Sequence, residues 1–309
     1  MVCEAEFVDL SPTPEQEAIR QEVRAWLVEN LPWEYGQGLP PRFEDLGEEV
    51  AFLRTWQASL AAGGWVGVAW PESYGGRGAG PAEHFIVQEE LARARAPEMV
   101  GRIGLNLAAP TLLACGTEAQ QGRWLSRIRT AEELWCQLFS EPGAGSDLAS
   151  LKTRADRVEG GWLVNGQKVW TSYAQFADWG VCLARSDPNA TKHKGISYLV
   201  IDMHHPGVEV RPLVQLTGEA EFNEVFLTDV FVPEDQLIGP EHEGWRSPIP
   251  RCRTRGVRIP VSSSSTCNCS RSFSGWPSST GPSTISDSGA PSPRRTWRSG
   301  CSSCTTSGA

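Results

Sequence analysis

The chain has 309 residues, of which 40% are apolar and 21% are charged, and its formal net charge at pH 7 is −9. This composition is typical of a globular protein with enough apolar material for a core, and it is unlike that of a disordered chain. The sequence has no run near the roughly 18 apolar residues of a membrane span, and its acidic start "MVCEAEFVDL" does not resemble a signal peptide, so we expect a cytoplasmic protein without a membrane span.

Residues 1–133 are expected to form an all-helical domain. The first helix begins near "TPEQEAIRQEVRAWL", where Thr13 can cap the helix and Gln16 can close a capping box. A second box joins Thr117 to Gln120. The apolar spacing predicts five helices, at about 13–31, 48–62, 82–95, 104–115 and 117–129.

Residues 134–246 are expected to form a β-domain. From Leu134 the apolar spacing changes from the helical period to the strand period, in short segments such as "LWCQLF", "GWLVNGQKVWTS" and "GISYLVIDM". Asn165-Gly166 is the dipeptide that favours a two-residue hairpin turn. The predicted fold class is therefore α+β, with a helical domain followed by an antiparallel barrel or sandwich.

Four cysteines precede residue 246. They are widely spaced, with no histidine at ligand spacing: Cys3, Cys115, Cys136 and Cys182. We interpret them as reduced, structural thiols and expect no metal site.

The stretch "SEPGAGSD", residues 140–147, follows the first predicted strand. Gly143 and Gly145 begin a G-x-G-x-x-G pattern, but Leu148 occupies its third position and no parallel βαβ unit surrounds it, so the dinucleotide fingerprint fails. A Walker loop is excluded because no Gly-Lys-Ser/Thr ending is present. Taken alone, a glycine-rich stretch of this kind is more often a structural turn than a binding loop, so by itself it does not predict a site.

A second segment, "KVWTSY", carries an aromatic side chain and two hydroxyls on one strand: Trp170, Thr171 and Ser172. Trp170 alone is readily explained by core packing. Beside a glycine-rich loop, however, an indole could stack on a planar ring, and a hydroxyl two residues away would share its face of the strand. The two segments together predict a pocket for a flat heteroaromatic cofactor.

Several stretches resemble the acyl-CoA dehydrogenase family: "WCQLFSEPGAGSDLASLKTRA", "GWLVNGQKVWTSYAQFADWGVCLAR", "GEAEFNEVFLTDVFVP", "GGWVGVAWPESYGGRG" and "EEL" followed by "RA". They cover nearly all of residues 1–246. The resemblance implies a helical domain, a middle β-domain and a C-terminal four-helix domain, assembled as homo- or hetero-tetramers. It also implies a flavoprotein oxidoreductase of fatty acid metabolism. A glutamate would remove the α-proton of an acyl-CoA while the β-hydride passes to N5 of FAD, and an electron-transfer flavoprotein or a similar acceptor would take the electrons.

The resemblance also implies the roles of individual residues. The stretch from Gln137 to Ser146 matches the loop that holds the flavin ring, in which Ser140 lies near the reactive edge and Ser146 also contacts the acyl-CoA. Trp170 and Ser172 match the tryptophan and threonine that flank the ring. The expected cofactor-binding residues are Gln137, Phe139, Ser140, Gly145, Ser146, Trp170, Thr171 and Ser172.

The resemblance ends at Arg246. Of 28 Lys and Arg and 37 acidic residues, only 8 Arg and one acid, Asp287, follow it, so residues 1–246 carry a net charge of −16 and residues 247–309 a net charge of +7. The second segment also holds 18 Ser and 5 of the 9 Cys, and three prolines near its start exclude a continuous helix. We expect residues 247–309 to be disordered and to have been read in a shifted frame, with a genuine basic tail as the alternative.

This interpretation has a chemical consequence. In the family, the base glutamate lies in the C-terminal four-helix domain, which would be absent, so no residue of this chain is assigned as the base. The leading hypothesis is thus an impaired acyl-CoA dehydrogenase, and the alternative is a noncatalytic subunit that holds acyl-CoA or flavin in a hetero-oligomer. A nucleic-acid contact through the Arg-rich tail is disfavoured, because the tail lacks interleaved aromatics and is joined to an acidic body.

Overall fold

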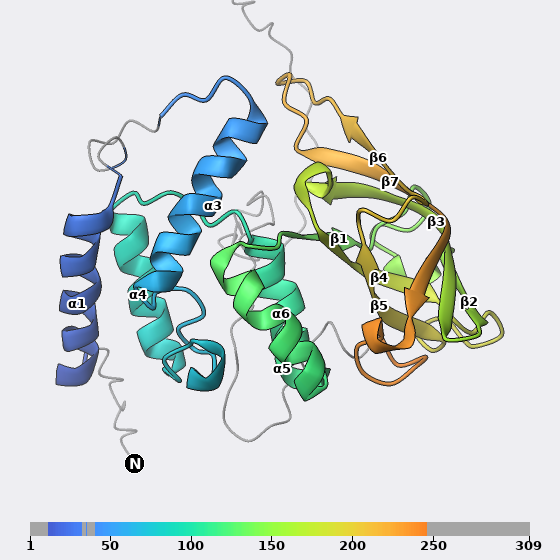
Figure 1. Cartoon of the computed structure of the whole chain (residues 1–309), viewed down its shortest axis with the longest axis horizontal. Helices are drawn as coiled ribbons and strands as arrows, with labels where there is room; N and C mark the ends of the chain where they lie inside the picture. Colours follow the sequence, from blue (N-terminus) through green and yellow to red (C-terminus); the bar gives the residue numbers. More distant parts are fainter. Residues whose placement is uncertain (1–11, 33–34, 36–40, 246–309) are drawn as a thin grey trace, which may run out of the picture. The chain divides into compact units, whose positions relative to one another are not determined.

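Helices form the first half of the described chain and strands the second half (Figure 1). The structure, a computed structural model, describes residues 12–32, 35 and 41–245, all of which belong to one compact unit. The interpretation of residues 247–309 as a disordered, frame-shifted tail therefore lies outside the described residues. The division into two domains at residue 133 stays a prediction.

Two capping boxes start helices where the sequence predicts them. The Thr13 hydroxyl accepts a hydrogen bond from the Gln16 backbone N–H at 3.3 Å, and the Gln16 side chain accepts one from the Thr13 N–H at 3.0 Å. Thr117 and Gln120 repeat the arrangement at 3.2 and 2.9 Å. Each box satisfies two N–H groups that have no partner inside the helix. The helices are α1 (Pro14–Asn30), α3 (Leu46–Ala62), α4 (Pro81–Arg93), α5 (Ala109–Cys115) and α6 (Glu118–Thr130).

The helix expected at 104–115 is not a single regular helix. It begins as a π-helical turn, Gly104–Ala108, and continues as α5. Pro110 lies at the start of α5, where it has no N–H to donate to the preceding turn, so the change of helix type falls at this point. Among the described residues, no helix is both long enough and apolar enough to cross a bilayer.

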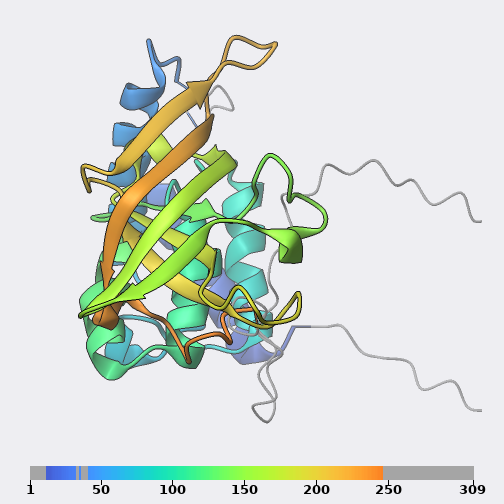
Figure 2. The ribbon, with the colours of Figure 1, turned by 90° about the vertical axis from the view of Figure 1, so that its right-hand side faces the viewer.

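The strands form one curled sheet in the order β1-β4-β2-β3-β7-β6, with β5 paired to the other edge of β4 (Figure 2). Most pairs are antiparallel, as expected, but β4 runs parallel to both β1 and β2. The predicted α+β fold class, with helices followed by a largely antiparallel curled sheet, is confirmed, and the parallel pairs of β4 are an addition to it. The strands are β1 (Trp135–Leu138), β2 (Arg154–Val158), β3 (Gly161–Ser172), β4 (Trp179–Arg185), β5 (Ile196–Asp202), β6 (Val208–Leu213) and β7 (Phe222–Pro233).

The prediction of a hairpin turn at Asn165-Gly166 is wrong. Both residues lie inside β3, at a point where its register with β7 shifts. The Asn165 side chain accepts a hydrogen bond from the Asp229 N–H at 2.9 Å, across an irregularity where Asp229 is left-handed with φ 49°. A Cβ on Gly166 would lie 2.3 Å from the Thr153 hydroxyl oxygen, so glycine is needed for close approach. The dipeptide thus serves a bulge, and the β2–β3 turn contains Gly160 instead, with φ 77°.

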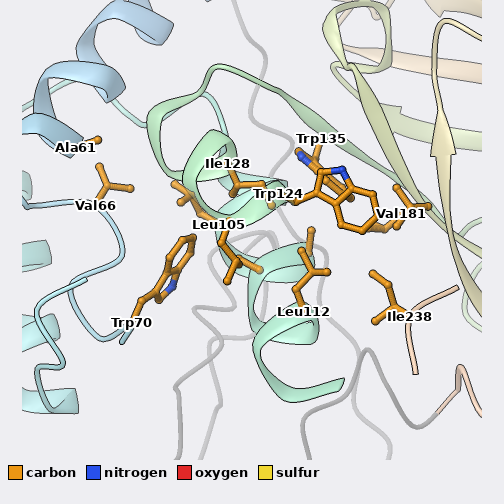
Figure 3. Packing of buried hydrophobic residues seen from close by; sticks show 14 of the residues in the cluster. Ala61, Val66, Trp70, Leu105, Leu112, Trp124, Ile128, Trp135, Val181 and Ile238 are labelled. Carbon is orange, nitrogen blue, oxygen red and sulfur yellow. The ribbon is translucent and has the colours of Figure 1, made fainter. Parts of the chain in front are cut away.

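The start of β1 is fixed by a buried aromatic contact with the helices (Figure 3). Trp124 of α6 and Trp135 of β1 are perpendicular, with ring centroids 5.6 Å apart. Val181 of β4 and Leu112 of α5 belong to the same buried cluster. Because β1 leads directly into the glycine-rich stretch 140–147, this packing holds the origin of that loop in place.

Candidate functional site

The glycine-rich loop begins with a tight turn. Glu141 and Ala144 exchange two backbone hydrogen bonds, of 3.1 Å from the Glu141 N–H and 3.0 Å from the Ala144 N–H. Gly143 and Gly145 are not among the residues with left-handed φ, and a Cβ on either would meet no atom within 4 Å. Neither the backbone conformation nor the packing within the described chain requires glycine at these positions. The open space in front of them permits a ligand to approach the backbone closely.

Trp170 lies on a β-bulge beside this loop. Lys168 pairs with Val225 of β7 and Thr171 pairs with Asn223, so two residues of β3 stand opposite one residue of β7. Trp170 has φ 60° and is 63% exposed, and its indole meets only the edge of the Phe222 ring among the ring contacts described, at 6.1 Å. The alternative explanation of Trp170 as a core residue is therefore wrong.

The loop and the bulge are directly bonded. The backbone N–H of Val169, the residue before Trp170, donates to the Ser140 carbonyl at 2.9 Å. A bulky residue in the left-handed region is unfavourable by about 1–3 kcal/mol and is found mainly where function requires it. An exposed indole held in that conformation against an open glycine turn is suited to flank a flat ligand.

The other residues predicted to bind the cofactor differ in how far they are exposed. Ser140 and Ser172 are half-buried, and Gly145 and Ser146 are exposed. These four residues, with Trp170, are available to a ligand from the loop and from the end of β3.

Three predicted residues present their side chains differently. Thr171 is fully buried because alternate residues of a strand point to opposite sides, so its hydroxyl does not join the exposed group. Phe139 is buried against Tyr198, with ring centroids 6.2 Å apart, and is thus a core residue through its side chain. Gln137 is half-buried within β1 and pairs with Val181 of β4.

Sequence reasoning missed an ion pair beneath the loop. The Lys168 ammonium, fully buried, lies 2.9 Å from a carboxylate oxygen of Glu141, which is itself 7% exposed. Burial would raise the pKa of the Glu141 carboxyl, but the Lys168 charge and the hydrogen bonds it accepts outweigh burial and hold that pKa below its ordinary value. The available signal was a lysine at an inward-facing position of an otherwise apolar strand, "LVNGQKVW".

The exposed indole, the two glycines with open space where a Cβ would lie and the half-buried hydroxyls of Ser140 and Ser172 are groups suited to contact a flat ligand. In the described residues, no group of three or more metal-ligating side chains is assembled.

Comparisons with known proteins identify the family of the chain. The family model described as "Acyl-CoA dehydrogenase, N-terminal domain" matches residues 13–132, and the model described as "Acyl-CoA dehydrogenase, middle domain" matches residues 136–230. The acyl-CoA dehydrogenase IpdE1 of Mycobacterium tuberculosis (strain H37Rv) is 47% identical over 234 residues, which are 74% of this chain and 60% of the relative.

Two solved structures are similar to this chain with a TM-score of 0.66 each. The ChsE4-ChsE5 complex from Mycobacterium tuberculosis is 33% identical, covering 77% of this chain and 59% of that chain. A structure described as Tcur3481-Tcur3483 steroid ACAD is 32% identical, covering 77% of this chain and 60% of that chain. The chain thus spans about 60% of the length of these relatives. The matches to both family domains, in order, establish that this chain belongs to the acyl-CoA dehydrogenase family.

Proposed function

We propose that residues 134–245 hold the flavin ring of FAD for the α,β-dehydrogenation of an acyl-CoA thioester. The observation that carries this proposal is Trp170, exposed and left-handed on a bulge that is hydrogen-bonded to the glycine loop. FAD, when bound, supplies the hydride acceptor of the reaction. The Trp170 indole flanks the ring, and the hydroxyls of Ser140 and Ser172 donate to its polar edge.

The same loop has a second role in this proposal. Ser146 is exposed, in contrast to the buried Glu141 of the same loop, so its hydroxyl is free to meet the acyl-CoA as well as the flavin. Hydrogen-bond donors directed at the ring stabilise the negative charge that develops on it during reduction. The protein part of the site therefore binds, orients and stabilises, while an acceptor flavoprotein re-oxidises the cofactor.

A flavin titration tests this function. Riboflavin, which carries the ring without the adenine half, is titrated into the full chain and its fluorescence quenching is measured. Loss of one aromatic contact is worth about 1 kcal/mol, so Trp170→Ala should raise the Kd for riboflavin about fivefold. Phe85→Ala is the control, because Phe85 is 67% exposed on α4 and lies outside the site. Unchanged riboflavin affinity in Trp170→Ala would contradict the assignment.

We also propose that the reading frame is lost after Arg246 and that activity is impaired, because the base glutamate and the four-helix domain would follow that point. The supporting observation is the change of net charge from −16 to +7 at this position. The DNA downstream of the Arg246 codon tests it. A second frame encoding an acidic, helix-forming sequence is expected, and its absence would leave a genuine basic tail as the explanation.

A noncatalytic role in a hetero-oligomer is the second candidate. It is favoured by the solved structures whose descriptions name two chains, ChsE4-ChsE5 and Tcur3481-Tcur3483. In this case a second chain of the same family should co-purify from the native host and be identified by mass spectrometry. A homotetramer that retains FAD and oxidises an acyl-CoA by itself would exclude this candidate.

A further inference from the structure

The buried pair of Glu141 and Lys168 connects separate parts of the site. Lys168 is fully buried, and its ammonium donates to the Glu141 carboxylate at 2.9 Å, to the Phe139 carbonyl at 3.1 Å and to the Leu183 carbonyl at 2.8 Å. An ammonium has three protons, so these three acceptors use its full donor capacity. Through this one group, β3 is fixed to the end of β1 and to β4.

Glu141, near the start of the glycine loop, is also hydrogen-bonded to the residues that follow the loop. Its carboxylate also accepts hydrogen bonds from the backbone N–H of Lys152 at 2.6 Å and of Thr153 at 2.9 Å. Lys152 and Thr153 follow the glycine loop in the chain, while Glu141 precedes its glycines. The carboxylate therefore holds together the two ends of the segment that carries Gly143, Gly145 and Ser146.

The pair also lies at the base of the bulge. Lys168 immediately precedes Val169 and Trp170, and the Val169 N–H donates to the carbonyl of Ser140, next to Glu141. Two interactions consequently join the glycine loop to the bulge that carries Trp170: the ion pair of Glu141 with Lys168, and the backbone hydrogen bond from Val169 to Ser140. A change in the length or charge of this ion pair must change the separation between the glycines and Trp170.

Stability alone does not account for such a pair. Removing two charges from water is costly, and replacing a buried ion pair by apolar residues of similar volume is often neutral or stabilising. A buried ion pair whose hydrogen bonds are all formed specifies one arrangement of the segments it joins, whereas an apolar contact permits several arrangements. The site that this geometry serves is the exposed group made by the loop and the bulge.

We propose that Glu141 and Lys168 are positioning residues that set the spacing between the glycine loop and Trp170 and thereby control affinity for the flavin ring. The inference rests on the proposed function, and it adds a supporting layer beneath the residues that would touch the cofactor. Neither side chain contacts the flavin itself. Both act through the backbone of the loop and of the bulge.

Four forms of the full chain test this proposal: the unmodified protein, Glu141→Gln, Lys168→Met and the double variant. Each single variant leaves one buried charge or one set of buried carbonyls without its partner, so it should unfold at a lower temperature. The double variant removes both charges and should recover most of the lost thermal stability. Its loop, however, has lost the Glu141–Lys168 tie to β3 and keeps the backbone hydrogen bond from Val169 to Ser140, so its Kd for riboflavin should stay about tenfold higher than that of the unmodified chain.

Hydrogen exchange provides a readout that needs no flavin. In the double variant, the segment 140–153 should exchange faster than in the unmodified chain while the remainder of the sheet is protected as before. The control removes an exposed ion pair between Arg157 of β2 and Glu234, the residue that follows β7, through Arg157→Met and Glu234→Gln. This control should change neither the exchange of 140–153 nor the riboflavin Kd.

The outcomes are distinguishable. If riboflavin affinity and loop protection in the double variant recover together with thermal stability, the pair is structural only and the proposal is overturned. If the unmodified chain binds no riboflavin, the proposed function fails, and the positioning of the cofactor fails with it. Exchange of 140–153 that is unchanged in the double variant would show that the pair does not order the loop.

Discussion

Replacing Lys168 by methionine should destabilise the protein strongly. The substitution leaves the Glu141 carboxylate, 7% exposed, without its counter-charge, and it removes the donor from the carbonyls of Phe139 and Leu183. Breaking a buried pair by removing one partner costs about 3–5 kcal/mol. For a chain of this size, that corresponds to a fall in Tm of about 10 °C.

The pH dependence of this loss identifies its cause. In the unmodified chain the pKa of Glu141 is lowered from 4.5, so its contribution to stability is present above about pH 4.5 and is lost as the pH falls through the folded-state pKa. In Lys168→Met the counter-charge of Glu141 is gone. Burial then raises the pKa of the Glu141 carboxyl in the folded protein, so this carboxyl takes up a proton at a higher pH than in the unfolded chain. The stability gap between the two proteins should therefore be largest above about pH 5 and should narrow toward pH 4.

Urea unfolding followed by circular dichroism at several pH values measures this gap. Glu141→Gln/Lys168→Met provides the internal control, because without either charge its stability should lack the pH dependence that comes from Glu141. A loss below about 1 kcal/mol in Lys168→Met at pH 7, or a gap that does not change with pH, would refute the reasoning.

Three further substitutions test single residues, two through both stability and binding and one through stability alone. Gly145→Val should leave Tm unchanged, because a Cβ at this position meets no atom within 4 Å. It should weaken riboflavin binding, because the valine side chain fills the space that the ring would occupy. A lower Tm would show that the glycine is needed for packing. Trp170→Gly should raise the free energy of unfolding by about 1 kcal/mol, because glycine relieves the left-handed conformation at φ 60°, and should weaken riboflavin binding at least about fivefold. A variant less stable in urea would contradict the assigned strain. Thr13→Ala should cost about 1 kcal/mol through loss of the capping box on α1. Urea unfolding measures this loss against Thr130→Ala, which changes a half-buried threonine at the C-terminal end of α6 that belongs to no capping box.

The sequence predicts best what local chemistry determines. The capping boxes at Thr13 and Thr117 depend on residues three positions apart, and both are present as expected. Asn165-Gly166 misleads because the same dipeptide serves a turn or a bulge. The deciding contacts come from Thr153 and from Asp229, which is 64 residues away in the chain from Asn165.

In the candidate site, too, local motifs can be recognised in the sequence, whereas contacts between distant residues cannot. The glycine loop and Trp170 are visible as motifs, but the bulge that exposes Trp170 depends on the register with β7 and cannot be read from "KVWTSY" alone. Thr171 was expected to join the site and is buried instead, because the bulge leaves it on the core side of β3. The pair of Glu141 and Lys168 spans 27 residues, so only the folded sheet shows that the two charges meet.

The most direct test of the central claim is a hydrogen-exchange map of the full chain with and without added riboflavin. The account predicts that riboflavin slows exchange in two segments, 140–147 and 168–172, and that Trp170→Ala needs about fivefold more riboflavin for the same protection. Protection confined to other segments, or the same protection in Trp170→Ala as in the unmodified chain, would contradict the claim that this loop and this bulge hold the flavin ring.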